Sequence, residues 1–179
     1  MSLMEAGDRS RMLKMLAESR DALCSAAANV TEDQARLRPA PDKWSVLDCV
    51  EHVAITEHFM FSTVATQSTP APPTGDRSRE EFFLRAIPNR VNKIAAPDRA
   101  HPKGRFATLA AALDQFNQNR ARTIDYVQHC DKDLRAHTVP HVLFGQITVQ
   151  EILIIIALHP TRHAAQIHEV RESLGLHSR

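Results

Sequence analysis

Two histidines, His159 and His163, directly follow the most apolar run of the sequence, ILIIIAL at residues 152–158. If this segment is helical, both imidazoles lie on a stripe of positions three or four apart in which every other member is apolar. That stripe consists of Ile152, Ile156, His159, His163, Ile167, Val170 and Leu174. Two imidazoles four residues apart share a helix face and can bind one divalent ion. The same spacing also occurs in hydrogen-bonded core pairs, so the pair alone leaves both interpretations open.

A third ligand would favour a metal site, and the segment SVLDCVEHVAITEHF offers two histidines, His52 and His58. Neither is central to the most apolar face of that helix, and periodicity favours His52 only slightly. His137 and His141 are also four residues apart, but Pro140 lies between them, so we expect them in a loop. The remaining histidines are expected at the surface or near chain ends: His101, His129, His168 and His177.

Four long segments carry the period of an amphipathic helix, and these segments must position the histidines. They span approximately residues 8–30, 45–67, 108–130 and 148–174. SVLD at Ser45 and TVQE at Thr148 are capping boxes, which mark helix N-termini, and Gly175 stands where the last helix should end. Nine of the ten prolines lie outside the four segments, which supports their boundaries; Pro160 is the exception.

The connection between the second and third helical segments is long for a helical bundle. Within it, SREEFFLRA is expected to form a short extra helix with Ser78 as its cap. HTVPHVLF at residues 137–144 alternates like a strand, but it is too little for a sheet. The expected fold class is all-α: a four-helix bundle with a long connection between helices two and three, forming one domain over residues 1–179.

The composition argues against several classes of partner. The 22 Lys and Arg residues nearly balance the 21 Asp and Glu residues and are scattered, so no nucleic acid or anionic membrane is expected to bind. The longest uncharged apolar run is far too short to span a bilayer. Three cysteines without CxxC spacing fit reduced thiols. A cytoplasmic protein with a small-molecule or protein partner is the expectation.

Two stretches resemble a known family. KWSVLDCVEHVAITE near the N-terminus, together with HPTRHAAQI near the C-terminus, is similar to the DinB-like (DinB/YfiT) superfamily. The resemblance implies a four-helix bundle that holds a divalent metal, usually zinc or nickel, with one histidine from the second helix and two from the last. It therefore assigns His52, His159 and His163 as ligands and leaves His58 out. It also implies a homodimer.

Several residues near these ligands have two interpretations. Cys49 lies one turn before His52, where its sulfur could approach the ion or simply pack in the core. Glu57 and Gln166 could accept hydrogen bonds from ligand N–H groups, or could be solvated. Trp44 is expected to seal the end of the bundle by packing.

Pro160 predicts a kink, because its ring removes a hydrogen bond to the carbonyl of Ile156. The favoured interpretation is that the kink aims His159 at the ion and frees a carbonyl beside it. If the kink turned His159 away, the third ligand would be lost.

Three functional hypotheses remain open at this point. The resemblance favours a metal-dependent transferase or hydrolase in which the ion activates a low-molecular-weight thiol or water for attack on a small molecule. A non-catalytic metal-binding or stress-response bundle is the alternative. The third is a metal-free bundle whose core histidines are satisfied by hydrogen bonds. The sequence offers no obvious general base; Glu57 and His58 are the nearest candidates.

Overall fold

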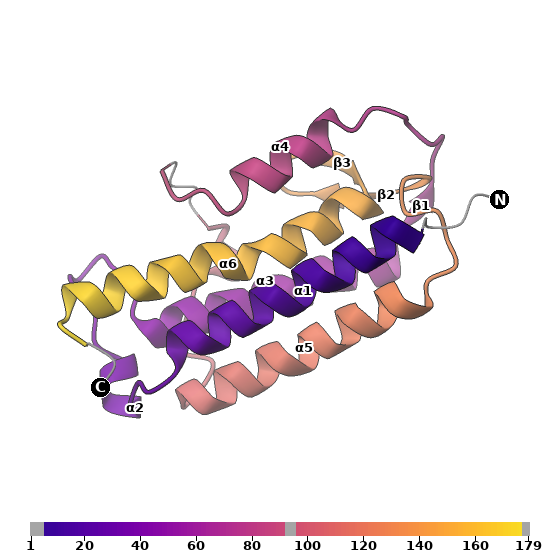
Figure 1. Ribbon diagram of the computed structural model, residues 1–179. Coiled ribbons are helices and arrows are strands. Elements are labelled where there is room, and N and C mark those ends of the chain that lie inside the picture. The colour runs from indigo at the N-terminus through magenta and orange to yellow at the C-terminus, as the bar shows by residue number, and fades with distance from the viewer. Residues whose placement is uncertain (1–5, 92–95, 177–179) are drawn as a thin grey trace.

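Four long helices form the body of the molecule in the computed structural model, which describes residues 6–91 and 96–176 (Figure 1). They are α1 (Ala6–Ala27), α3 (Val46–Gln67), α5 (Leu109–His129) and α6 (Val149–Ser173). α1 and α3 each pack against both α5 and α6. The expected all-α four-helix bundle is confirmed.

The helix directions explain the long connection after α3. Figure 1 shows α1 and α6 running in one direction and α3 and α5 in the other. Because α3 and α5 are parallel, the chain must return along the full length of the bundle before α5 can begin. That return path contains β1 (Thr69–Pro70), α4 (Ser78–Ala86) and a 3-10 turn, η1 (Asp98–Ala100).

Local sequence signals set most helix ends. Ser45 and Thr148 cap α3 and α6, and each hydroxyl accepts the backbone N–H of the acidic residue three positions later. In return, the carboxylates of Asp48 and Glu151 accept the backbone N–H of the capping residues. Both predicted capping boxes are therefore confirmed.

Two expectations for helix boundaries were wrong. The first helix ends at Ala27 rather than near Val30, because Asn29 adopts a left-handed backbone with φ 58° and Thr31 caps a separate short helix, α2 (Glu32–Ala35). Ser78 does not cap α4; it is the first helical residue, and the Asp76 carboxylate accepts its backbone N–H at 2.8 Å. An aspartate two residues earlier thus does what was expected of the serine.

A small antiparallel sheet was not expected. β2 (His137–His141) pairs with both β1 and β3 (Gly145–Thr148), in the order β1-β2-β3. β1 pairs only with the first two residues of β2, so Pro140 has no β1 residue beside it. The N–H group that proline lacks is therefore not required for pairing with β1. The sheet forms because Thr69 meets Thr138 across a long sequence separation, which the alternation in HTVPHVLF could not reveal.

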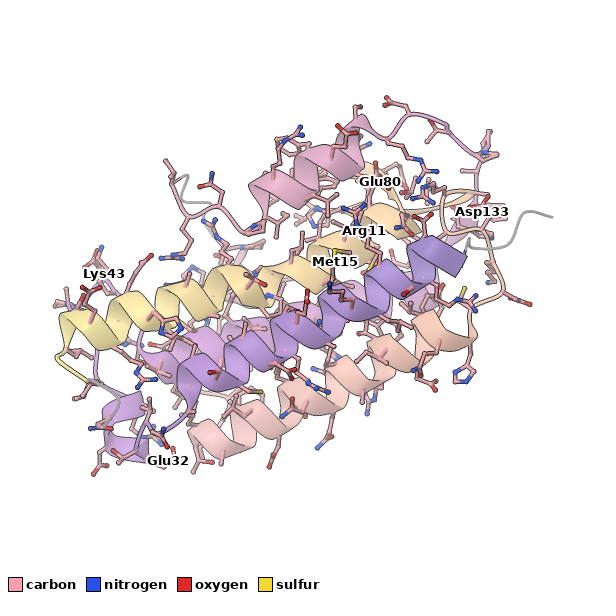
Figure 2. The ribbon with its side chains drawn as sticks, viewed as in Figure 1. Arg11, Met15, Glu32, Lys43, Glu80 and Asp133 are labelled. Atoms are coloured by element: carbon pink, nitrogen blue, oxygen red, sulfur yellow. The ribbon has the colours of Figure 1, made fainter. Side chains whose placement is uncertain are left out.

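Carboxylates of α2 and α4 fasten the connecting segments to the rest of the molecule. Glu32 of α2 accepts the N–H groups of Leu109 and Ala110 at the start of α5, where a carboxylate complements the helix dipole (Figure 2). Glu80 of α4 forms a two-pronged pair with Arg135, at 2.6 and 2.9 Å.

Within the described ranges, no helix combines the length and apolarity needed to cross a membrane.

Candidate metal centre

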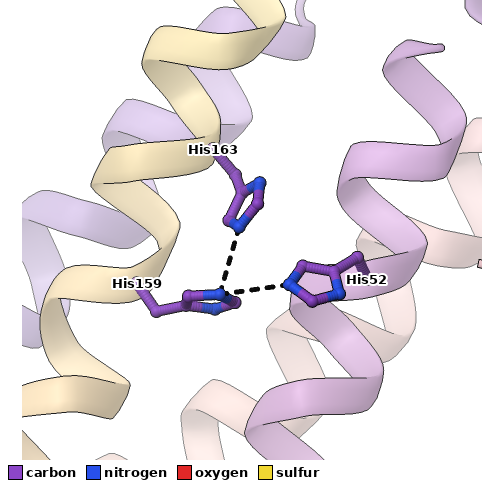
Figure 3. Close-up of side chains that lie close together, drawn as sticks. All are labelled: His52, His159 and His163. Atoms are coloured by element: carbon purple, nitrogen blue, oxygen red, sulfur yellow. Dashed lines mark hydrogen bonds between the residues drawn. The ribbon is translucent and has the colours of Figure 1, made fainter. Parts of the chain in front are cut away.

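Three histidines from two helices converge on one point (Figure 3). His52 projects from α3, and His159 and His163 project from successive turns of α6. The Nε2 atom of His159 lies 3.2 Å from that of His52 and 3.1 Å from that of His163. One nitrogen of each ring lies within 4.8 Å of the others, and among the described residues no cysteine or carboxylate joins this cluster.

Hydrogen bonds on the outer side fix two of the rings. The Nδ1–H of His52 donates to the carbonyl oxygen of Ala100 at 2.7 Å, which can only accept. The Nδ1–H of His163 donates to Oε1 of Gln166 at 2.9 Å, and the same oxygen accepts Nη1 of Arg90 at 3.2 Å. Each neutral ring therefore presents the lone pair of its Nε2 to the centre of the cluster.

The three imidazoles cannot satisfy one another. His159 can carry one proton on Nε2, and that proton can point at only one of its two neighbours. At least one inward lone pair is left without a donor from within the triad. A divalent ion requires a set of converging lone pairs, and acceptors behind the ligand rings fix the direction of those lone pairs. The triad offers three such nitrogens.

Burial keeps the triad neutral. It lowers the pKa of His52 to about 4, even though the hydrogen bond to Ala100 acts in the opposite direction. Burial also holds the pKa of His159 and of His163 well below the ordinary value, and the charges of neighbouring imidazoles lower both further. All three rings are therefore deprotonated at neutral pH, which is the form that binds metal.

Trp44 has a more direct role than sealing the bundle end. Its ring stacks on His163, with ring centroids 6.0 Å apart and an interplanar angle of 20°, and packs at a tilt on His52 at 4.8 Å. The indole thus covers one side of the cluster and restricts how the two imidazoles can rotate.

The cluster opens into a cavity of about 610 Å³. All three imidazoles line it, and so do Trp44 and Gln166. This volume lies within the range of small-molecule sites in proteins. Three imidazoles leave at least one coordination position of a divalent ion unfilled, and here such a position can face the cavity.

Other residues named from the sequence lie elsewhere. Cys49 is fully buried in the apolar core, and desolvation raises the pKa of its thiol. Glu57 contacts Arg120 and Thr123 instead of an imidazole. His58 is exposed. Gln166, in contrast, accepts a hydrogen bond from a triad ring, as considered from the sequence.

His137 and His141 are not loop residues but begin and end β2. The alternating, β-branched sequence around them pairs with β1 and β3, and this pairing outweighs the effect of Pro140.

Arg120 was missed by the sequence interpretation. It is fully buried, and each of the five N–H groups of its guanidinium has an acceptor: Glu57 twice, the Leu16 carbonyl, the Ser19 hydroxyl and the Ile156 carbonyl. A signal was present, because Arg120 lies four residues after Phe116 and four before Ile124, on the apolar stripe of its helix.

The hydrogen bond from Arg120 to the Ile156 carbonyl explains how α6 accommodates Pro160. α6 continues as a helix through Pro160, and Nη2 of Arg120 donates to the Ile156 carbonyl at 3.2 Å. The proline leaves this carbonyl without its helical donor, as expected, and the buried guanidinium supplies a replacement. His159 remains turned toward His52 and His163.

The comparison with known families decides the identity of the fold. A model described as the DinB superfamily matches residues 15–167, a range that includes all three histidines. The chain belongs to the DinB superfamily. The family resemblance inferred from the two sequence motifs is thereby confirmed.

The known proteins to which this chain is similar are distant in sequence. An uncharacterized protein, YuaE of Bacillus subtilis (strain 168), is 20% identical over 145 residues, covering 81% of this chain and 88% of that protein. YfiT from Bacillus subtilis, described as a probable metal-dependent hydrolase with an unusual four-helix bundle topology, superposes with a TM-score of 0.61 at 18% identity, over 98% of this chain and 92% of YfiT. A conserved protein from Enterococcus faecalis gives a TM-score of 0.68 at 15% identity, over 97% and 99%.

Proposed function

We propose that this DinB superfamily protein is a metal-dependent enzyme whose ion, zinc or nickel, is held by His52, His159 and His163 and acts on a small molecule. The observation that carries the proposal is the convergence of three neutral imidazoles at the wall of a cavity. The description of YfiT as a probable metal-dependent hydrolase supports it. The expected reaction is transfer of a low-molecular-weight thiol to an electrophile, or hydrolysis.

When bound, a divalent ion supplies a Lewis acid and lowers the pKa of a water or thiol that it binds. The protein's own residues hold the rings of His52 and His163 in place. Ala100 and Gln166 accept the outer N–H groups of two rings, and Trp44 packs against both of them. These contacts fix the direction of the inner lone pairs before any ligand enters, which is the preorganisation that metal sites require.

The proton acceptor is expected in the cavity wall. Glu57 is engaged by Arg120 and His58 is exposed, and neither lines the cavity. Outside the triad, the imidazoles that line it among the described residues are His101 and His141. We expect one of these two rings, or solvent, to take the proton of the attacking thiol or water.

A screen with purified, metal-loaded protein tests the proposal. It pairs low-molecular-weight thiols with an aromatic halide electrophile, and includes activated esters for hydrolysis. We expect turnover that is lost in His159→Ala and retained in His168→Ala, an exposed histidine on the same helix. Equal turnover in the two variants would contradict a catalytic role for the triad, and no turnover with any thiol or ester would contradict an enzymatic role.

A non-catalytic role is the second candidate, because the same three histidines join α3 to α6. An ion there would cross-link two helices of the bundle. In that case metal removal would lower the melting temperature, and no small molecule would bind to the cavity of the loaded protein.

A further inference from the structure

Thr56 carries a buried hydroxyl oxygen that the protein leaves without a partner. Among the described residues, three buried side-chain atoms lack a hydrogen-bond partner, and they belong to Arg9, Thr56 and Gln150. Of these three residues, Thr56 is the one that lines the cavity. A hydroxyl that is removed from water without a partner costs free energy. In a cavity wall, such a group indicates a ligand that supplies the missing hydrogen bond.

Other threonines of the same helix satisfy their hydroxyls locally. Thr63 and Thr66 of α3 each donate to the backbone carbonyl four residues earlier, at 3.0 and 2.7 Å. The equivalent acceptor for Thr56 is the carbonyl of His52, but the Thr56 hydroxyl forms no hydrogen bond with it. The donor of Thr56 is therefore unused.

This unused donor lies close to the triad in the fold. Thr56 follows His52 by one turn on the same face of α3, which is about 6 Å along the helix axis. Side chains of a helix tilt toward its N-terminus, so the Thr56 side chain leans toward His52. On the facing helix α6, the residues that line the cavity before His159 are Ile152 and Ile155, whose side chains offer no acceptor.

A hydroxyl donor beside a metal centre suits a ligand with two neighbouring oxygens. A carboxylate can place one oxygen at an ion held by the triad and turn the other toward the donor. A hydrogen bond to an ionised oxygen is about twice as strong as one between neutral groups. A donor in this place also stabilises the negative charge that develops on a carbonyl oxygen during hydrolysis.

We propose that the Thr56 hydroxyl donates a hydrogen bond to a carboxylate or carbonyl oxygen of the substrate, beside the ion held by His52, His159 and His163. The inference rests on the proposed function, because it places the substrate at that ion. It also narrows the substrate class to carboxylate and acyl compounds. Within the proposed function, it favours hydrolysis of an ester or amide over transfer of a thiol to a halide.

Ligand binding to cobalt-loaded protein tests the hydroxyl, because the visible absorption of bound cobalt changes when a ligand coordinates it. Acetate and thiocyanate are the probes, since both are monoanions but only acetate has a second oxygen beside the coordinating atom. Thr56→Val removes the hydroxyl and keeps the β-branched shape, and Thr56→Ser keeps the hydroxyl. Thr66→Val is the control, because the Thr66 hydroxyl already has an acceptor and lies outside the cavity. Thr56→Ala is a second variant without the hydroxyl, should the valine disturb the fold.

We expect the loss of the hydroxyl to affect one probe only. Thr56→Val should raise the Kd of acetate about tenfold and leave that of thiocyanate unchanged. Thr56→Ser should bind acetate nearly as tightly as the wild type, and Thr66→Val should bind both probes as the wild type does. Zinc affinity, measured by competition with a chromophoric chelator, should be the same in all of these proteins.

The outcomes that contradict the inference are distinct from those that contradict the proposed function. If the wild type binds no cobalt, the proposed function fails, and the inference fails with it. If cobalt binds but Thr56→Val and the wild type have the same affinity for acetate, the inference alone is overturned. An equal loss for thiocyanate would also overturn it. So would a fall in zinc affinity in Thr56→Val, because the hydroxyl would then orient a ligand ring instead of contacting the substrate.

Discussion

Two buried polar clusters lie within the same bundle, and they are built in opposite ways. Around Arg120, every guanidinium N–H has an acceptor and the charge is matched by Glu57. Around His159, three neutral rings turn nitrogen lone pairs toward one another and have too few protons to share. The hydrogen bonds of the first cluster are complete within the protein, whereas the second cluster leaves at least one nitrogen lone pair without a donor, which is where we propose that a cation binds. Satisfaction of hydrogen bonds thus separates a structural polar cluster from a ligand site.

The largest expected effect comes from breaking the complete cluster. Arg120→Leu leaves the Glu57 carboxylate buried without its partner and the Ile156 carbonyl without a donor, so we expect the free energy of unfolding to fall by about 3–5 kcal/mol. Urea denaturation measures this change. The double variant Arg120→Leu/Glu57→Leu should lose clearly less, because no uncompensated charge remains. Equal losses in the two variants would show that the charge pair is not what stabilises this region.

Acidification should destabilise the metal-free protein through the histidine cluster. The unfolded chain protonates histidine near its ordinary pKa of about 6.5, but folded His52 does so only near pH 4. Between these values the unfolded state holds more protons, so the stability of metal-free protein should fall as pH falls, by about 3 kcal/mol for His52 alone at pH 4. Urea denaturation at several pH values, beside His52→Leu, measures the contribution. The same pH slope in both proteins would contradict it.

The hydrogen bond behind His163 should have an intermediate effect. Gln166→Leu removes the acceptor of its Nδ1–H, which frees the ring to rotate and to change tautomer. We expect zinc affinity to fall about tenfold, with little change in unfolding free energy. Competition with a chromophoric chelator measures the affinity, and exposed Gln118→Leu on α5 is the control. Unchanged affinity would mean that Gln166 does not orient the ring.

The smallest effect is expected at Cys49. Its side chain is fully buried, and desolvation raises the pKa of its thiol, so it should stay protonated and react slowly with thiol reagents. Cys49→Ala should leave the metal content per chain unchanged. Loss of metal in this variant would instead show that Cys49 is a fourth ligand of the ion beside the three histidines.

Local signals made the helices predictable. Capping boxes at Ser45 and Thr148 and the apolar period located the bundle to within a few residues. The pairing of Thr69 with Thr138 was hidden, because it depends on contacts far apart in the sequence. The short helix after Thr31 was likewise missed, since four residues carry no readable period.

The site was only partly readable from the sequence. The spacing of His159 and His163 placed them on one face, but periodicity could barely separate His52 from His58. The family resemblance made that choice, and the structure brings His52 to the other two rings. The role of Arg120 was not readable, because its acceptors Leu16, Glu57 and Ile156 lie on three other helices. The homodimer remains a prediction.

The central claim is that His52, His159 and His163 hold one divalent ion, and metal content per chain tests it most directly. Elemental analysis of untagged protein after reconstitution with zinc or nickel should give about one ion per chain in the wild type and in His58→Ala, whose ring is exposed on the same helix as His52. His52→Ala and His163→Ala should bind little or none. No metal in the reconstituted wild type, or full occupancy in His163→Ala, would contradict the account.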